Sequence, residues 1–136
     1  MPARAEDYLR RFGMEETNVD PLKISQALGI KVITYREAAD LIVALGFSEF
    51  AEENDGFCVM VRNRPAIFYD DSRSPERQRA TIAHELGHVV NGDLERPRAP
   101  CAGRCCDKCR EWQADSFAFN LLFPDNQPKE KERSNP

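Results

Sequence analysis

Polar and apolar residues alternate along the chain with two different periods, which predict short helices interleaved with short strands. Apolar residues recur at helical spacing in the N-terminal third of the chain. Strict alternation, or a short apolar run between turn residues, indicates strands elsewhere. The pattern predicts helices over residues 3–13, 18–29 and 36–46, a strand over 30–35, and a β-hairpin over 57–70.

Two longer helices are predicted after the hairpin. Ser74 is placed to cap the first of them, Pro75 suits its first turn, and the Asn-Gly pair at positions 91 and 92 ends it. The second helix, largely apolar, is predicted over residues 110–123 and is stopped by Pro124. The buried face of the first long helix is expected to carry Ile82, Ala83, Leu86, Val89 and Val90.

The first long helix contains the sequence HELGH, in which His84 and His88 are the only two histidines of the chain. Residues four apart on a helix differ by about 40° around its axis, so both imidazoles project to the same side. That spacing suits two nitrogen ligands of one Zn²⁺. Glu85 lies about 100° away around the helix, where it can reach a metal-bound water instead of the metal. A chance match is the alternative, and the well-capped amphipathic helix around the motif argues against it.

A catalytic zinc takes three protein ligands and keeps one position open. The chain has no third histidine, and Leu94 stands where the extended metzincin motif would place one, which excludes that motif. The third ligand must then be a carboxylate or a cysteine. Glu111 is the strongest candidate, and Asp115, one turn later, can bind the second ring nitrogen of a ligating histidine. Cys58 is the cysteine alternative, although its apolar strand is more typical of a core residue.

Four of the five cysteines fall within the nine residues CAGRCCDKC, in the connection between the two long helices. Cys101, Cys105, Cys106 and Cys109 have three possible roles: ligands of a second, structural zinc, free thiols, or a disulfide or redox switch. Cys109 lies two residues before Glu111. We therefore expect a metal or an oxidation event in this segment to act on the position of Glu111.

Composition narrows the classes of function. A chain of 136 residues has the length of one domain, and its 41% hydrophobic and 31% charged residues are typical of a soluble globular protein. A net charge of −4 argues against direct binding to nucleic acid. No apolar run is long enough to span a membrane and the N-terminus lacks the apolar core of a signal peptide, so we expect a cytoplasmic protein. Thiols stay reduced there, which favours metal ligation over disulfides.

Two segments together resemble a known family. RQRATIAHELGHVVNGD and EWQADSFAFNLLFP are similar to the paired motifs of the ImmA/IrrE family of zincin-like metallopeptidases, and the resemblance covers about residues 3–124. It implies an α+β fold, a compact minimal zincin-like domain whose small, mostly antiparallel sheet packs on helices that include the HExxH helix. Ala80 and Gln113 depart from the family pattern, but neither replaces a catalytic group.

The resemblance also implies roles for individual residues. His84, His88 and Glu111 are expected to bind zinc, which lowers the pKa of a bound water from 15.7 toward about 7. Glu85 is expected to take the proton from that water and to hand it to the departing amine. The sequence itself, and not the resemblance, offers Tyr69 and either Arg77 or Arg79 as candidates for stabilising the oxyanion, although each is more typical of surface or packing.

The expected function is that of a zinc-dependent endopeptidase acting on a protein. Members of the family cleave or otherwise relieve a helix-turn-helix transcriptional repressor, often encoded nearby on a mobile element or in a stress-response circuit. Such a repressor is the expected partner, and it would contact DNA in place of this chain. The alternatives are a non-catalytic zincin-fold regulator or toxin–antitoxin component that binds a repressor without cleaving it, and a deformylase-like hydrolase with a cysteine ligand.

The same pattern sets the expected domain organisation. One metallopeptidase domain is predicted over residues 1–125, and within it a cysteine-rich connecting loop over residues 93–110. Residues 126–136 (NQPKEKERSNP) form a polar tail that is predicted to be disordered.

Overall fold

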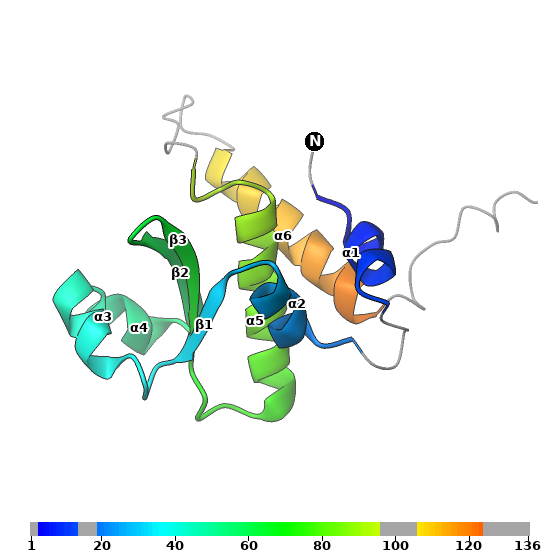
Figure 1. The fold of residues 1–136 in the computed structure, drawn as a ribbon. Helices are drawn as coiled ribbons and strands as arrows, with labels where there is room; N and C mark the ends of the chain where they lie inside the picture. The colour runs from blue at the N-terminus through cyan, green and yellow to red at the C-terminus, as the bar shows by residue number, and fades with distance from the viewer. Residues whose placement is uncertain (1–2, 14–18, 96–105, 124–136) are drawn as a thin grey trace, which may run out of the picture.

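The structure is a computed structural model that describes residues 3–13, 19–95 and 106–123 (Figure 1). Within these ranges the chain forms six helices and three strands. They are α1 (Ala5–Arg11), α2 (Pro21–Ala27), β1 (Lys31–Thr34), α3 (Ala39–Leu45), α4 (Ser48–Glu53), β2 (Gly56–Val61), β3 (Arg64–Tyr69), α5 (Pro75–Val90) and α6 (Cys106–Leu122).

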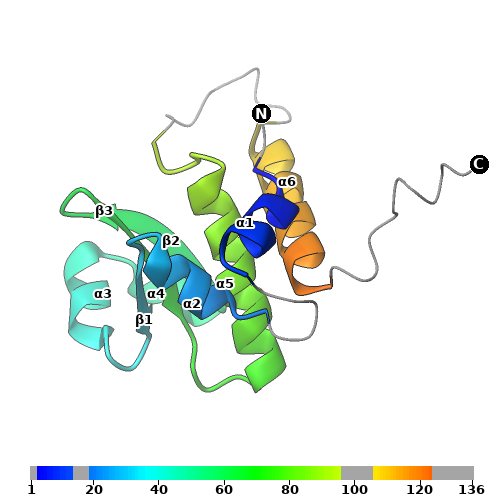
Figure 2. The same ribbon diagram turned by 45° about the vertical axis from the view of Figure 1, so that its right-hand side comes forward.

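The sheet separates two groups of helices. In Figure 1, α3 and α4 lie on one side of the strands, and α5 and α6 lie on the other. One apolar core joins the inner side chains of α1, α2, α5 and α6 to β3, and a smaller core lies between the sheet and α3–α4. Figure 2 shows α1 resting against α6. The predicted α+β fold is confirmed, and no helix among the described residues is long and apolar enough to cross a membrane.

The three strands run in the order β1–β3–β2 and form a mixed sheet. β2 and β3 are antiparallel, joined by a two-residue turn in which Arg62 and Asn63 both have positive φ, as a type I′ hairpin turn requires. β1 pairs with β3 in parallel. The sequence predicted a mostly antiparallel sheet, whereas one of its two pairings is parallel. The physical reason is that α3 and α4 carry the chain from β1 to the far edge of the sheet, where β2 runs opposite to β1. The hairpin turn then brings β3 back between them, in the direction of β1.

The local signals at the start of α5 act as predicted. The Ser74 side chain accepts a hydrogen bond from the backbone N–H of Arg77, and Pro75 is the first residue of α5. The Asp20 carboxylate caps α2 in the same way, through the N–H of Leu22. Along α5, the predicted apolar residues Ile82, Ala83 and Leu86 are buried, and Val89 and Val90 are half-buried.

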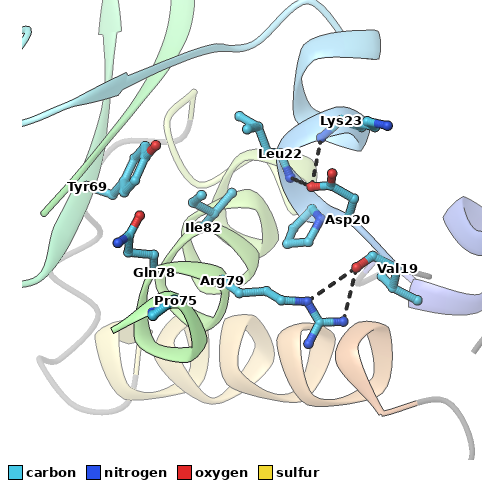
Figure 3. Close-up of a pocket in the computed structure, with 10 residues that line it drawn as sticks. Val19, Asp20, Leu22, Lys23, Tyr69, Pro75, Gln78, Arg79 and Ile82 are labelled. Carbon is cyan, nitrogen blue, oxygen red and sulfur yellow. Dashed lines mark hydrogen bonds between the residues drawn. The ribbon is translucent and has the colours of Figure 1, made fainter. Parts of the chain in front are cut away.

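A hollow of about 780 Å³ lies between the N-terminal half of α5 and the start of α2 (Figure 3). On one side of it, Arg79 donates two hydrogen bonds to the carbonyl oxygen of Val19, at 3.0 and 3.3 Å. This contact joins residues 60 positions apart in the sequence and fixes the approach of the chain to α2. Tyr69, from the end of β3, lines the opposite side.

Two features differ from the predicted elements. The sequence pattern did not predict α4, because its six residues contain only one large apolar side chain, Phe50, and no periodicity emerges from so short a segment. The helix expected from residue 110 begins four residues earlier, at Cys106, so the C-terminal end of the predicted connecting loop is helical. The tail over residues 126–136 lies outside the described residues, and the single domain over 1–125 stays a prediction.

Helices α5 and α6 lie close together at Gly87. A Cβ atom at this position would lie 3.0 Å from the carbonyl oxygen and 3.1 Å from the Cα atom of Ala114. Both atoms belong to the backbone of α6, so they cannot move aside without moving the helix. The absence of a side chain at Gly87 therefore sets the distance between the two helices.

We expect Gly87→Ala to destabilise the protein. In an unhindered helix, this exchange gains about 1 kcal/mol of helix propensity. Here the added methyl group forces α6 outward, and overpacking of this kind costs roughly 1–3 kcal/mol. Urea unfolding followed by circular dichroism measures the difference, and a variant at least as stable as the parent would contradict a tight α5–α6 contact.

Candidate functional site

His84 and His88 lie on the side of α5 that faces α6 and the edge strand β2. Their ring centroids are 4.8 Å apart and their planes are nearly perpendicular, at 84°. The side chain of His84 is 23% exposed and that of His88 is 12% exposed, so both rings are packed against surrounding groups but remain accessible to solvent. This is the one-sided projection that the spacing of HELGH predicts.

Glu111 on α6 reaches both imidazoles. Its Oε1 lies 3.0 Å from Nε2 of His84, and its Oε2 lies 3.1 Å from Nε2 of His88. One ligand atom from each of the three residues can be chosen so that all lie within 4.8 Å of one another. Ligand atoms around a tetrahedral zinc are about 3.3 Å apart, given bonds of about 2.0–2.1 Å to nitrogen and oxygen. Two nitrogens and a carboxylate at these distances fit the donor set of a catalytic zinc.

The other nitrogen of each ring contacts a second carboxylate. Nδ1 of His84 is 2.7 Å from Oδ1 of Asp115, and Nδ1 of His88 is 2.8 Å from Oδ2 of Asp93. Carboxylates in this position fix the tautomer and the orientation of a ligating imidazole, which leaves Nε2 available for a metal. Both Nε2 atoms point at Glu111, and both Nδ1 atoms point at supporting acids.

The contact of Asp115 with His84 follows from the spacing of the sequence, whereas that of Asp93 with His88 does not. Asp93 follows the end of α5, where its backbone N–H donates to the carbonyl oxygen of His88 at 3.0 Å. Its side chain is 6% exposed, against 71% for Asp115, and Nε of Arg110 lies 3.8 Å from its second oxygen. The sequence signal that could have identified Asp93 is its position directly after the Asn-Gly pair that ends the helix, five residues after His88.

Glu85 is buried beside the two histidines and not among the three candidate ligands. Burial raises the pKa of its carboxyl group, and a hydrogen bond with the Cys58 thiol acts in the opposite direction. Burial also raises the pKa of Cys58, with the charge of Glu85 as the next cause. A thiol that holds its proton contacts Glu85 in place of a metal, so this geometry does not favour Cys58 as the third ligand.

One cleft of about 720 Å³ is lined by most of these groups: His84, Glu85, His88, Asp93, Glu111 and Cys58, but not Asp115. Helix α5 and the start of α6 form one wall, and β2 with the α3–α4 corner forms the other. None of the three weak oxyanion candidates lines it: Tyr69 and Arg79 line the separate hollow of Figure 3, and Arg77 pairs with Asp55.

The cysteine cluster is only partly described. Cys101 and Cys105 lie outside the described residues, Cys106 is the first residue of α6, and Cys109 is an exposed free thiol in its first turn. A second zinc or a redox switch here therefore stays a prediction.

Comparison with known proteins agrees with this geometry. The family model described as the IrrE N-terminal-like domain of the M78 peptidases matches residues 26–135, which is most of the chain. The chain belongs to this family. No curated protein and no solved structure matches it significantly. The expected family is thus confirmed, and α5, α6, β2 and β3 all lie within the matched part of this IrrE-like chain.

The first prediction from the site concerns Glu111. We expect the IrrE-like chain to bind one zinc here. Glu111→Gln should weaken zinc binding by more than the ~10–100-fold that is typical when a residue supporting a metal ligand is lost. Glu76→Gln is the matched control, because it removes the same charge from an exposed position on α5. Competition with a chromogenic zinc chelator measures the affinities. Unchanged binding in Glu111→Gln, together with weaker binding in Cys58→Ser, would support the cysteine alternative instead.

The second prediction concerns Asp93. Asp93→Asn keeps the shape of the side chain but loses the charge that orients His88, so zinc affinity should fall by about 10–100-fold. Asp40→Asn, an exposed acid at the start of α3, provides the control. Equal zinc affinity in the two variants would show that Asp93 does not support the site.

Proposed function

We propose that this protein is a zinc-dependent endopeptidase. The observation that carries the proposal is the convergence of His84, His88 and Glu111 in a cleft that also contains the buried Glu85. Membership in a peptidase family supports the reaction class.

Each residue has a defined task in this proposal. A zinc ion bound at the site would supply a Lewis acid and lower the pKa of water toward about 7. Glu85 would accept a proton from the attacking water and deliver it to the leaving nitrogen. Its burial supports both steps, because a carboxyl group with a raised pKa gains a proton more readily than an exposed one. Asp93 and Asp115 would hold the imidazoles in place.

The edge of the sheet offers a place for an extended substrate. β2 is an edge strand in the order β1–β3–β2, and it borders the cleft. Met60 faces Pro65 across the hairpin, and because proline has no N–H, this pair is not hydrogen-bonded. The backbone groups of Met60, and of Cys58 two residues before it, therefore point away from β3. Strand GFCVMV also lacks the lysine or proline that usually protects an edge.

The proposed substrate is a protein, and more narrowly a helix-turn-helix repressor. This proposal rests on the resemblance to the ImmA/IrrE family and on the net charge of −4, which leaves DNA contact to the partner. A cytoplasmic location fits such a partner and is part of the same proposal.

We expect Glu85→Gln to bind zinc as the parent does but to lose cleavage. Removal of a general acid–base costs about 10²–10⁴-fold in rate. The measurement is gel electrophoresis and mass spectrometry of the repressor encoded beside this gene, after incubation with zinc-loaded protein. Cut repressor is expected with the parent and intact repressor with Glu85→Gln.

The control for this experiment is Glu76→Gln, which should cut as the parent does. A repressor that stays intact with zinc-loaded parent, yet forms a stable complex with it, would contradict the peptidase and support the non-catalytic regulator.

A further inference from the structure

The cleft extends from the charged groups around the histidines to an aromatic wall. Phe47 and Phe50, at the start of α4, pack on Phe57 of β2, with ring centroids 5.3 and 5.6 Å from that of Phe57. Among the described residues that line this end of the cleft, Asn54 alone has a polar side chain. The charged residues in the described lining are Glu85, Asp93, Arg110 and Glu111, and they lie at the other end.

This wall is exposed although it is apolar. Phe50 is 48% exposed, whereas Phe57, on which it packs, is 5% exposed. Met60, on the opposite face of β2, is 39% exposed and also lines the cleft. The ring of Phe50 stands perpendicular to that of Phe57, at 90°, in an edge-to-face contact. Exposed apolar groups that line a cleft are typical of a binding surface.

The backbone around Phe50 holds the wall in place. The side chain of Asn54 donates a hydrogen bond to the carbonyl oxygen of Phe50, at 2.9 Å. The hydroxyl group of Tyr35 donates to the carbonyl oxygen of Asn54, at 2.8 Å. These contacts tie α4 to the end of β1, so the apolar wall is preformed and a ligand need not order it.

The alternation of β2 relates the wall to the metal cluster. Phe57 and Val59 face α3–α4, whereas Cys58 packs on the opposite side, toward α5. A peptide lying along the free edge of β2 would alternate in the same way. Side chains on one face of such a peptide approach Glu85 and the histidines, and those on the other face approach Phe50.

We propose that Phe47, Phe50 and Phe57 form a specificity subsite that accepts one large apolar side chain of an extended peptide, close to the bond to be cleaved. This inference rests on the proposed function, because it assumes that the cleft binds a peptide. The substrate class then narrows to segments with leucine, isoleucine, methionine or phenylalanine at one fixed position. Because a helix-turn-helix domain buries such residues, the segment must be extended and accessible when it binds.

A binding experiment tests the subsite without requiring cleavage. The zinc-loaded Glu85→Gln protein is immobilised and exposed to a phage-displayed library of random decapeptides, and the bound peptides are sequenced. We expect large apolar residues at one position to be enriched over charged residues by about tenfold or more, as burial of such a side chain allows. Adding Phe50→Ser should abolish this enrichment, and adding Phe50→Leu should retain it.

Phe119→Ser is the matched control, since Phe119 is a phenylalanine on α6 with 49% exposure and does not line the cleft. Circular dichroism and one zinc per chain establish that each variant is folded. Peptides that bind with no apolar position, or with the same enrichment in Phe50→Ser and Phe119→Ser, would overturn the subsite alone. If no peptide binds the Glu85→Gln protein, the cleft does not bind peptides, and this result would overturn both the subsite and the proposed function.

Discussion

Two helices can place three ligands around one ion only if they lie close together, and here the close approach occurs at Gly87. The residue stands between the two histidines of α5, and it contacts Ala114, which lies between Glu111 and Asp115 of α6. The turns that touch are therefore the turns that carry the candidate ligands. The glycine of HELGH serves packing, and through packing it sets the distance at which nitrogen and carboxylate oxygen atoms meet.

Charge is the second constraint on this site. Glu85, Asp93, Glu111 and Asp115 surround two imidazoles, and carboxylates so close together repel one another. A divalent cation would offset that repulsion, which is a physical reason for such a cluster to bind a metal. The two supporting acids differ in setting: Asp93 is buried next to Arg110, whereas Asp115 is exposed to solvent. Salt in solution should therefore screen the contact of His84 with its acid more than that of His88.

What the sequence predicts correctly depends on local rules. The capping of α5 by Ser74 and the one-sided histidine pair need no knowledge of the rest of the fold. Glu111 and Asp115 were found because they are acids at helical spacing on an apolar helix. Asp93 was missed because its approach to His88 depends on how the chain turns after α5. The contact of Cys58 with Glu85 was missed because it joins a strand to a helix. The parallel pairing of β1 was missed because it depends on β3, and not β2, lying beside β1.

The position of Glu111 within α6 couples the site to helix formation. His84 lies in the interior of α5 and His88 in its last turn, and Glu111 is in the second turn of α6, a helix that begins at Cys106. Helix ends open more readily than helix interiors, so the turn of α6 that supplies the carboxylate is among the less stable parts of the site. An ion that bridges both helices would bind most tightly to the state in which this turn is formed. By thermodynamic linkage, the free energy of binding would then also be free energy of local folding, and zinc concentration would regulate how much of α6 is helical.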